Sequence, residues 1–216
     1  MKKFTPLILL AFSLLLAGCS NKANQIEISP ENTKAILIDG TYRVDPEAST
    51  LYWEAFKAVG GHMGGISLKQ GELVVQNEIP TQGSFVIDMA SITNTDLENK
   101  AFRKNLVNNL KSDDFFSVAD YPTAIFDITR VLPYKGEGDY NFEIEGDLSL
   151  RGVTQPVTIL TKIQINEKKL TAFARTEIDR TQFNIITRSD SFFEKLEEQL
   201  IKDSFIIEMD LVANRL

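Results

Sequence analysis

Strict alternation of apolar and polar residues over 140–150 is the feature that most restricts the fold of this chain. One face of this segment is apolar and carries Tyr140, Phe142, Ile144, Leu148 and Leu150. Successive side chains of a strand point to opposite faces, so the pattern predicts an antiparallel strand with one buried face. The same period recurs in 157–165, 205–211 and 85–89. Several long strands of this kind predict an all-β domain, either a barrel or a sandwich.

Two segments between the strands carry helical signals instead. Thr95 and Glu98 have the spacing of a capping box, and apolar residues follow at four-residue intervals from Phe102 to Leu110. Ser191 and Glu194 repeat this spacing ahead of Leu196 and Leu200. Both segments are amphipathic, so the sequence predicts two short helices that lie on the sheet or cover one end of it.

The interior of such a domain has two possible forms. A barrel of about eight strands is either filled by its own side chains or holds one small ligand. Strands of about a dozen residues, each rising ~3.4 Å, would make a tube suited to a long thin ligand. Alternation by itself is compatible with both forms.

The N-terminal segment has the features of an export signal. Lys2 and Lys3 precede an apolar run over 6–15 that is shorter than the ~20 residues needed to span a bilayer. The segment ends in Leu16-Ala17-Gly18-Cys19, which resembles the lipobox of bacterial lipoproteins; the alternative is a plain secretory signal that contains a cysteine. The expected organisation is a signal peptide over 1–18, a lipidated Cys19 with a polar tether over 19–40, and a barrel over 41–216. Ser20 favours the outer membrane, with the domain facing the periplasm.

Cysteine content and charge exclude several functions. Cys19 is the only cysteine, so an acylated mature chain has no disulfide, zinc-thiolate site or cysteine nucleophile. Loss of Lys2 and Lys3 with the signal changes the formal net charge from −7 to −9. With no cluster of basic residues, nucleic acid is excluded as a partner, and membrane attachment is assigned to the acyl anchor.

Six motifs in a fixed order resemble those of the YceI-like family of polyisoprenoid-binding, lipocalin-like proteins. They lie at 42–53, 61–73, 88–96, 110–126, 146–157 and 179–193, and together cover about residues 41–212. The most specific is 146–157, with the sequence Gly-Asp-Leu-Ser-Leu-Arg-Gly-Val-Thr-Gln-Pro-Val. The stretch 186–189 departs from the family pattern, so no role is carried over to Arg188.

The resemblance implies an antiparallel lipocalin-like barrel around an elongated apolar pocket. It also implies an isoprenoid lipid as ligand, such as a polyprenyl phosphate or an isoprenoid quinone. The candidate ligand-binding residues are Trp53, His62, Phe85, Phe126, Tyr140, Phe142, Leu148, Arg180, Phe205 and Ile207.

Two of these candidates are polar, and each has an alternative structural role. His62, the only histidine, lies between glycines and either donates to a lipid head group or caps a turn. Arg180 either pairs with a phosphate or quinone oxygen or is a surface arginine that bridges Asp179 or the second helix.

The function predicted from the sequence is therefore that of a membrane-anchored carrier that does not transform its ligand. No catalytic residue, metal ligand or cofactor is predicted. A hydrolase is the first alternative, but the chain has one histidine, no nucleophile elbow and no clustered metal ligands. An envelope scaffold with a packed barrel is the second. The oligomeric state is left open.

Overall fold

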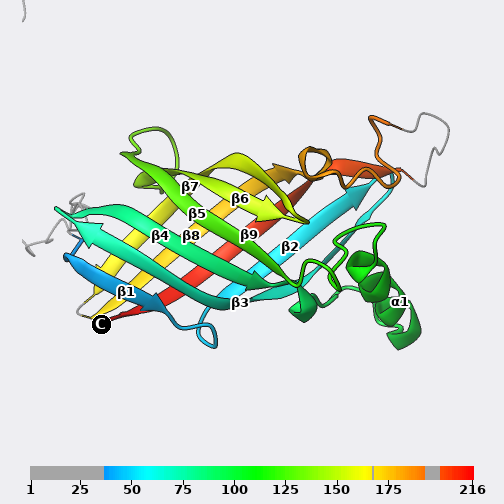
Figure 1. Ribbon diagram of the computed structural model, residues 1–216, viewed down its shortest axis with the longest axis horizontal. Coiled ribbons are helices and arrows are strands. Elements are labelled where there is room, and N and C mark those ends of the chain that lie inside the picture. Colours follow the sequence, from blue (N-terminus) through cyan, green and yellow to red (C-terminus); the bar gives the residue numbers. More distant parts are fainter. Residues whose placement is uncertain (1–36, 167, 193–199) are drawn as a thin grey trace, which may run out of the picture. The chain divides into compact units, whose positions relative to one another are not determined.

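The computed structural model describes residues 37–166, 168–192 and 200–216, in which nine antiparallel strands form one sheet (Figure 1). The strands are β1 Gly40–Val44, β2 Thr50–Lys57, β3 Gly61–Gln76, β4 Ile79–Asp88, β5 Thr123–Pro133, β6 Phe142–Leu150, β7 Val153–Asn166, β8 Lys169–Asp179 and β9 Ile201–Arg215. Helix α1 spans Lys100–Lys111, and the short 3₁₀ helices η1 and η2 span Met89–Ser91 and Arg180–Phe183. No helix in these residues is long and apolar enough to span a membrane.

The sheet closes on itself as a barrel of eight strands, β2 to β9, because β3 pairs with both β2 and β4. Strands β1 and β2 occupy the same place in the order of strands, one after the other, because each pairs with β3 on one side and β9 on the other. At the break between them, the Asp45 N–H donates to the Val212 carbonyl at 2.8 Å, and the Val212 N–H donates to Ser49 Oγ at 3.0 Å. These bonds continue the ladder across the break, which confirms the predicted closed barrel.

Strands β6 and β7 show how the most specific motif folds. Phe142, Ile144, Leu148 and Leu150 are buried on the inner face of β6. Arg151 and Gly152, both with positive φ, then reverse the chain into β7. Two left-handed residues in a two-residue hairpin loop match the right-handed twist of the flanking strands, which accounts for the Arg-Gly pair.

The packed part of the barrel lies at the end where β1 pairs with β9. Its core includes Leu37, Tyr42, Val75, Leu170 and Ala213, all fully or almost fully buried. Leu37 belongs to this core, so the folded domain starts before residue 41, where the tether was expected to end. Although Leu37 follows a mostly polar segment, burial of its own apolar side chain stabilises the barrel, and this joins it to the folded domain.

The first predicted helix is present, but its predicted N-cap is wrong. Helix α1 begins at Lys100, and the side chain of Asn99 accepts hydrogen bonds from the N–H groups of Ala101 and Phe102. Thr95 lies five residues before this helix, and its N–H donates to the Met63 carbonyl of β3, so its segment runs along the barrel edge before the helix begins. The second predicted helix, over 191–200, lies mostly outside the described residues.

Candidate functional site

The barrel encloses an internal cavity of about 200 Å³. Its lining is apolar except for Thr161, Thr176, Arg180 and Lys202. Ligand pockets are usually apolar with a few placed polar groups, so this composition fits a site for a hydrophobic molecule.

Burial along β9 shows which end of the cavity is closed. The inward-facing side chains of Phe205, Ile207 and Met209 are only partly buried, although the barrel surrounds them. Further along, Leu211 is buried at the end of the cavity, and Ala213, which faces the same way, lies in the packed core beyond it. The barrel is therefore hollow toward the start of β9 and filled toward its end.

The cavity is elongated along the barrel. Ile201 and Leu211 of β9 both line it, which corresponds to about 34 Å of strand and, at a tilt of about 40°, roughly 26 Å along the axis. Small inward residues on β8, Ala172 and Ala174, leave room beside the larger side chains of β9.

The mouth of the cavity lies at the α1 end. Leu110 of α1 and Phe116 of the following loop line it there and are partly exposed, and Lys202 is exposed. The segment at Thr93 packs over this end of β3, because a Cβ on Gly64 would lie 1.9 Å from the Thr93 carbonyl oxygen. Glycine at position 64 thus allows the Thr93 carbonyl to accept a hydrogen bond from Trp53 Nε1 at 3.0 Å.

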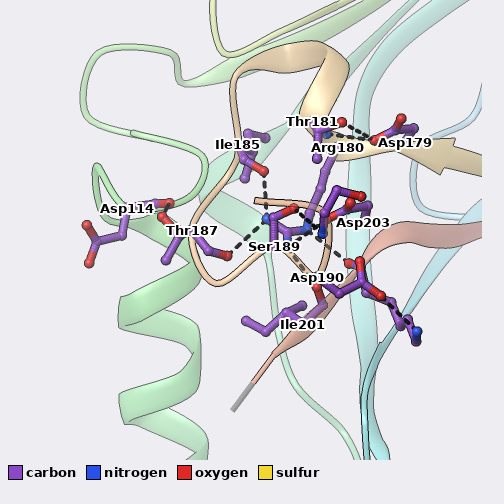
Figure 2. A network of polar contacts seen from close by, with 12 residues as sticks. Asp114, Asp179, Arg180, Thr181, Ile185, Thr187, Ser189, Asp190, Ile201 and Asp203 are labelled. Atoms are coloured by element: carbon purple, nitrogen blue, oxygen red, sulfur yellow. Dashed lines mark hydrogen bonds and ion pairs between the residues drawn. The ribbon is translucent and has the colours of Figure 1, made fainter. Parts of the chain in front are cut away.

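Arg180 is buried at the mouth, with only 4% of its surface exposed. Its guanidinium donates to four backbone carbonyl oxygens at 2.6–3.1 Å, those of Ile185, Thr187, Ile201 and Lys202 (Figure 2). The remaining N–H lies on Nη2, which is 3.5 Å from Asp203 Oδ1. A guanidinium has five N–H donors, so four are bonded to carbonyls and the fifth faces the Asp203 carboxylate without a hydrogen bond to it. Burial contradicts the predicted surface arginine, and these contacts show that Arg180 holds the loop after η2 against the start of β9. Its role as a head-group ligand stays a prediction.

Carboxylates balance the buried charge of Arg180. Burial lowers the pKa of Arg180, while Asp203, Asp190 and Asp179 act in the opposite direction. Burial acts to raise the pKa of Asp203, but the hydroxyls of Ser189 and Ser191 and the Arg180 charge outweigh it and hold that pKa below its usual value. Lys202 is paired with Asp190 at 2.7 Å. Both cations of the mouth are thus already engaged.

Seven of the predicted ligand-binding residues line the cavity: Trp53, Phe85, Phe126, Leu148, Arg180, Phe205 and Ile207. Phe142 faces inward but packs in the filled core beyond the cavity. Tyr140 was expected inside, yet it stacks on Phe173 with ring centroids 6.5 Å apart. Phe173 alternates with the cavity residues Ala172 and Ala174, so Tyr140 lies on the outer face. The reason is that β6 begins at Phe142, and the alternation does not extend into the loop before it.

His62 also lies outside the cavity lining. Its Nδ1 is 2.8 Å from Asp96 Oδ2, so the ring holds the loop before α1 instead of a ligand. Partial burial acts to raise the pKa of Asp96, but hydrogen bonds from the Met63 N–H, His62 and Asn94 lower it below its usual value. Of the two roles considered for His62, this contact with the loop is closer to capping a turn than to donating to a lipid head group.

Several cavity residues on β7 and β8 are not among the residues predicted from the sequence. Thr161 is polar within the apolar face of 157–165, but it faces inward like Ile159 and Ile163. On β8 the inward residues are small, and the large Phe173 points outward. Position along the strand, and not side-chain size, was the signal that could have identified them.

Comparison with known proteins places this geometry in a family. The YceI-like domain matches residues 42–213. Among solved structures, Burkholderia cenocepacia BcnA is 22% identical and superposes with a TM-score of 0.61, covering 79% of this chain and 99% of that chain. A polyisoprenoid binding domain from Saccharophagus degradans is 13% identical, with a TM-score of 0.56, and covers 83% of this chain and 100% of that chain. Both share the fold.

Curated relatives match over shorter stretches. A UPF0312 protein of Shewanella denitrificans is 40% identical over 84 residues, which are 36% of this chain and 42% of that protein. Protein YceI of Escherichia coli O157:H7 is 47% identical over 55 residues, 26% of this chain and 27% of that protein. The chain thus spans less than half the length of each of these relatives. Because the family match extends over almost the whole described barrel, this chain belongs to the YceI-like family.

Proposed function

We propose that this protein binds an elongated isoprenoid lipid inside its barrel and carries it, chemically unchanged, in the bacterial envelope. The observation that carries this proposal is the hollow half of the barrel. There the side chains of Phe205, Ile207 and Met209 face inward but are only partly buried. A packed scaffold would bury these side chains. The Saccharophagus degradans domain, described as polyisoprenoid binding, supports the choice of lipid.

The mouth favours an uncharged head group, such as a quinone, over a phosphate. Arg180 and Lys202 are the two cations among the described lining residues, and both are engaged by carbonyls or carboxylates. Asp203 Oδ1 is buried without a hydrogen-bond partner in the described part of the chain. A phosphate near Arg180 and Lys202 would lie close to their partners Asp203 and Asp190, whose charges repel it, and this is unfavourable in a partly desolvated site.

Titration of isoprenoid quinones of increasing chain length tests the proposal. Trp53 is the only tryptophan and lines the cavity, so its fluorescence reports occupancy directly. We expect one ligand per barrel and tighter binding with length, by about 0.8 kcal/mol for each buried methylene, until the cavity is full. Polyprenyl phosphates of matched length should compete weakly.

A pair of neighbouring substitutions provides the control. Ala174→Leu adds volume inside the cavity and should weaken binding by about tenfold or more, whereas Arg175→Leu adds the same side chain on the outer face and should not. Affinity that does not depend on chain length would favour the scaffold. Recovery of a chemically altered quinone would make the protein an enzyme.

The proposal includes a lipid anchor on Cys19, supported by the lipobox-like sequence before it. We expect Cys19→Ala to leave a folded barrel but to move the protein from the membrane to the soluble fraction after a salt wash, because stable anchoring requires acyl chains. Fractionation with mass spectrometry of the N-terminus measures this. Membrane retention of the Cys19→Ala chain after the wash contradicts the anchor. Ser20 supports an outer-membrane location facing the periplasm.

A further inference from the structure

Exposed large apolar side chains gather around the mouth of the cavity. Val59 is 74% exposed, Phe102 is 63% exposed and Phe192 is 59% exposed. They belong to three separate segments, the β2–β3 turn, α1 and the loop after η2, which all lie at the same end of the barrel (Figure 1). At the opposite end of the described barrel, the exposed large apolar residues are Ile38 and Leu216.

Backbone contacts tie these segments to the mouth. Ala58, next to Val59, donates its N–H to the Leu200 carbonyl, adjacent to the lining residue Ile201. The Phe192 N–H donates to the Ser189 carbonyl, and Ser189 forms a bridge with Ile201. Single exposed apolar residues are ordinary on a protein surface, but a set that rims one opening indicates an interaction surface.

Helix α1 gives this rim a basic element in an acidic protein. It carries Lys100, Arg103, Lys104 and Lys111 and no acidic residue, while the whole chain has a net charge of −7. Arg103 and Lys111 donate to backbone carbonyls, which leaves Lys100 and Lys104 exposed to solvent.

Two acidic residues beside α1 are engaged within the protein, whereas Glu98 and Asp114 are exposed. Asp96 binds His62 and the Met63 N–H, and Asp113 accepts from the Ser117 hydroxyl. Exposed lysines beside an exposed Phe102 match the composition of segments that lie in the interface of an anionic bilayer.

We propose that the mouth of the barrel docks on an anionic lipid surface, with Val59, Phe102 and Phe192 among the lipid head groups. A lipid could then pass between bilayer and cavity without crossing water. That passage rests on the proposed function, whereas docking does not require a ligand.

Depth-dependent quenching in vesicles tests the docking. The full chain with Val59→Cys is labelled with an environment-sensitive fluorophore and added to vesicles of phosphatidylcholine and phosphatidylglycerol that contain a spin-labelled phosphatidylcholine. We expect a blue shift and quenching at position 59, and neither at a label on Tyr52→Cys, which is exposed on the barrel wall. The chain without an added cysteine is treated in the same way, and its fluorescence measures how much of the fluorophore reacts with Cys19.

Two further variants test the apolar and the basic components. In the labelled chain, Phe102→Ser should weaken vesicle affinity by about tenfold, since burial of one aromatic side chain is lost, and Tyr52→Ser should not. Lys100→Glu with Lys104→Glu, or vesicles of phosphatidylcholine alone, should reduce quenching. Equal quenching at positions 59 and 52, or none at 59, overturns the docking and leaves the rim for a protein partner. Quinone titration of Trp53 in the absence of vesicles is independent of this result, so the two proposals can fail separately.

Discussion

Replacing Arg180 with alanine is expected to lower the free energy of unfolding by about 3–5 kcal/mol, because it removes a buried cation and leaves the partly buried Asp203 without its cationic partner. Four carbonyl groups also lose their donor, and the loop after η2 loses its attachment to β9. Denaturant unfolding followed by Trp53 fluorescence measures the change. Arg180→Lys should restore only part of the loss, since an ammonium has three donors where the guanidinium has five.

Arg175→Ala is the matched control for this substitution. Arg175, on β8, also has carboxylate partners, Glu208 at 3.3 Å and Glu54 at 3.8 Å, but it is exposed. Exposed ion pairs contribute about 0–1 kcal/mol, so this variant should unfold near the wild-type midpoint. Similar losses at positions 180 and 175 would contradict the structural role of Arg180.

The partner carboxylate adds a pH dependence to the same experiment. The pKa of Asp203 lies below its usual value in the folded protein, so its charge adds stability above the unfolded pKa of about 3.9. This contribution is lost as the pH falls through the lower, folded pKa. The stability difference between wild type and Asp203→Asn should therefore shrink in acid, and a constant difference from neutral pH to about pH 3 would exclude the carboxylate as its source.

Phe142→Asp is expected to have an effect at least as large, of more than about 5 kcal/mol. Loss of a buried phenyl group costs about 3–5 kcal/mol, and an unpaired carboxylate in the filled core adds to this. Because small domains are stable by about 5–15 kcal/mol, the variant should lose its cooperative unfolding transition or keep only a remnant of it. Circular dichroism and thermal unfolding measure this.

Glu143→Ala is the control on the neighbouring, outward-facing position of β6. Glu143 is partly exposed and alternates with the buried Phe142 and Ile144, so its loss should change stability by no more than about 0.5 kcal/mol. Comparable melting temperatures for the Phe142 and Glu143 variants would show that the inner and outer faces of β6 are assigned incorrectly.

Local patterns predicted the parts of the molecule that local geometry controls. Period-two alternation identified several strands and placed Phe85, Leu148 and Phe205 inside, because inward and outward positions alternate in any strand. The same rule failed at Tyr140, where only pairing with β7 determines that β6 begins at Phe142. The capping-box spacing failed at Thr95, whose N–H donates to Met63 of β3, a strand about thirty residues earlier in the chain.

The role of Arg180 could not be predicted, for a related reason. Its partners are backbone carbonyls, which every residue carries and which leave no trace in a sequence. The carbonyls come from two segments, the loop at 185–187 and the start of β9, that are brought together only by closure of the barrel.

By itself, the sequence predicted long antiparallel strands with one apolar face, and its order of motifs, through the resemblance to YceI-like proteins, implied a barrel around an apolar pocket. Only the tertiary structure decided where that interior is empty. Ile207 and Ala213 of β9 have the same alternation and both point into the barrel, yet Ile207 lines the cavity and Ala213 is packed. The difference comes from what lies across the barrel: Leu37, Tyr42 and Leu170 fill one end, while the other is left open beneath α1. Such contacts join residues far apart in the chain, so no periodicity along the sequence can record them.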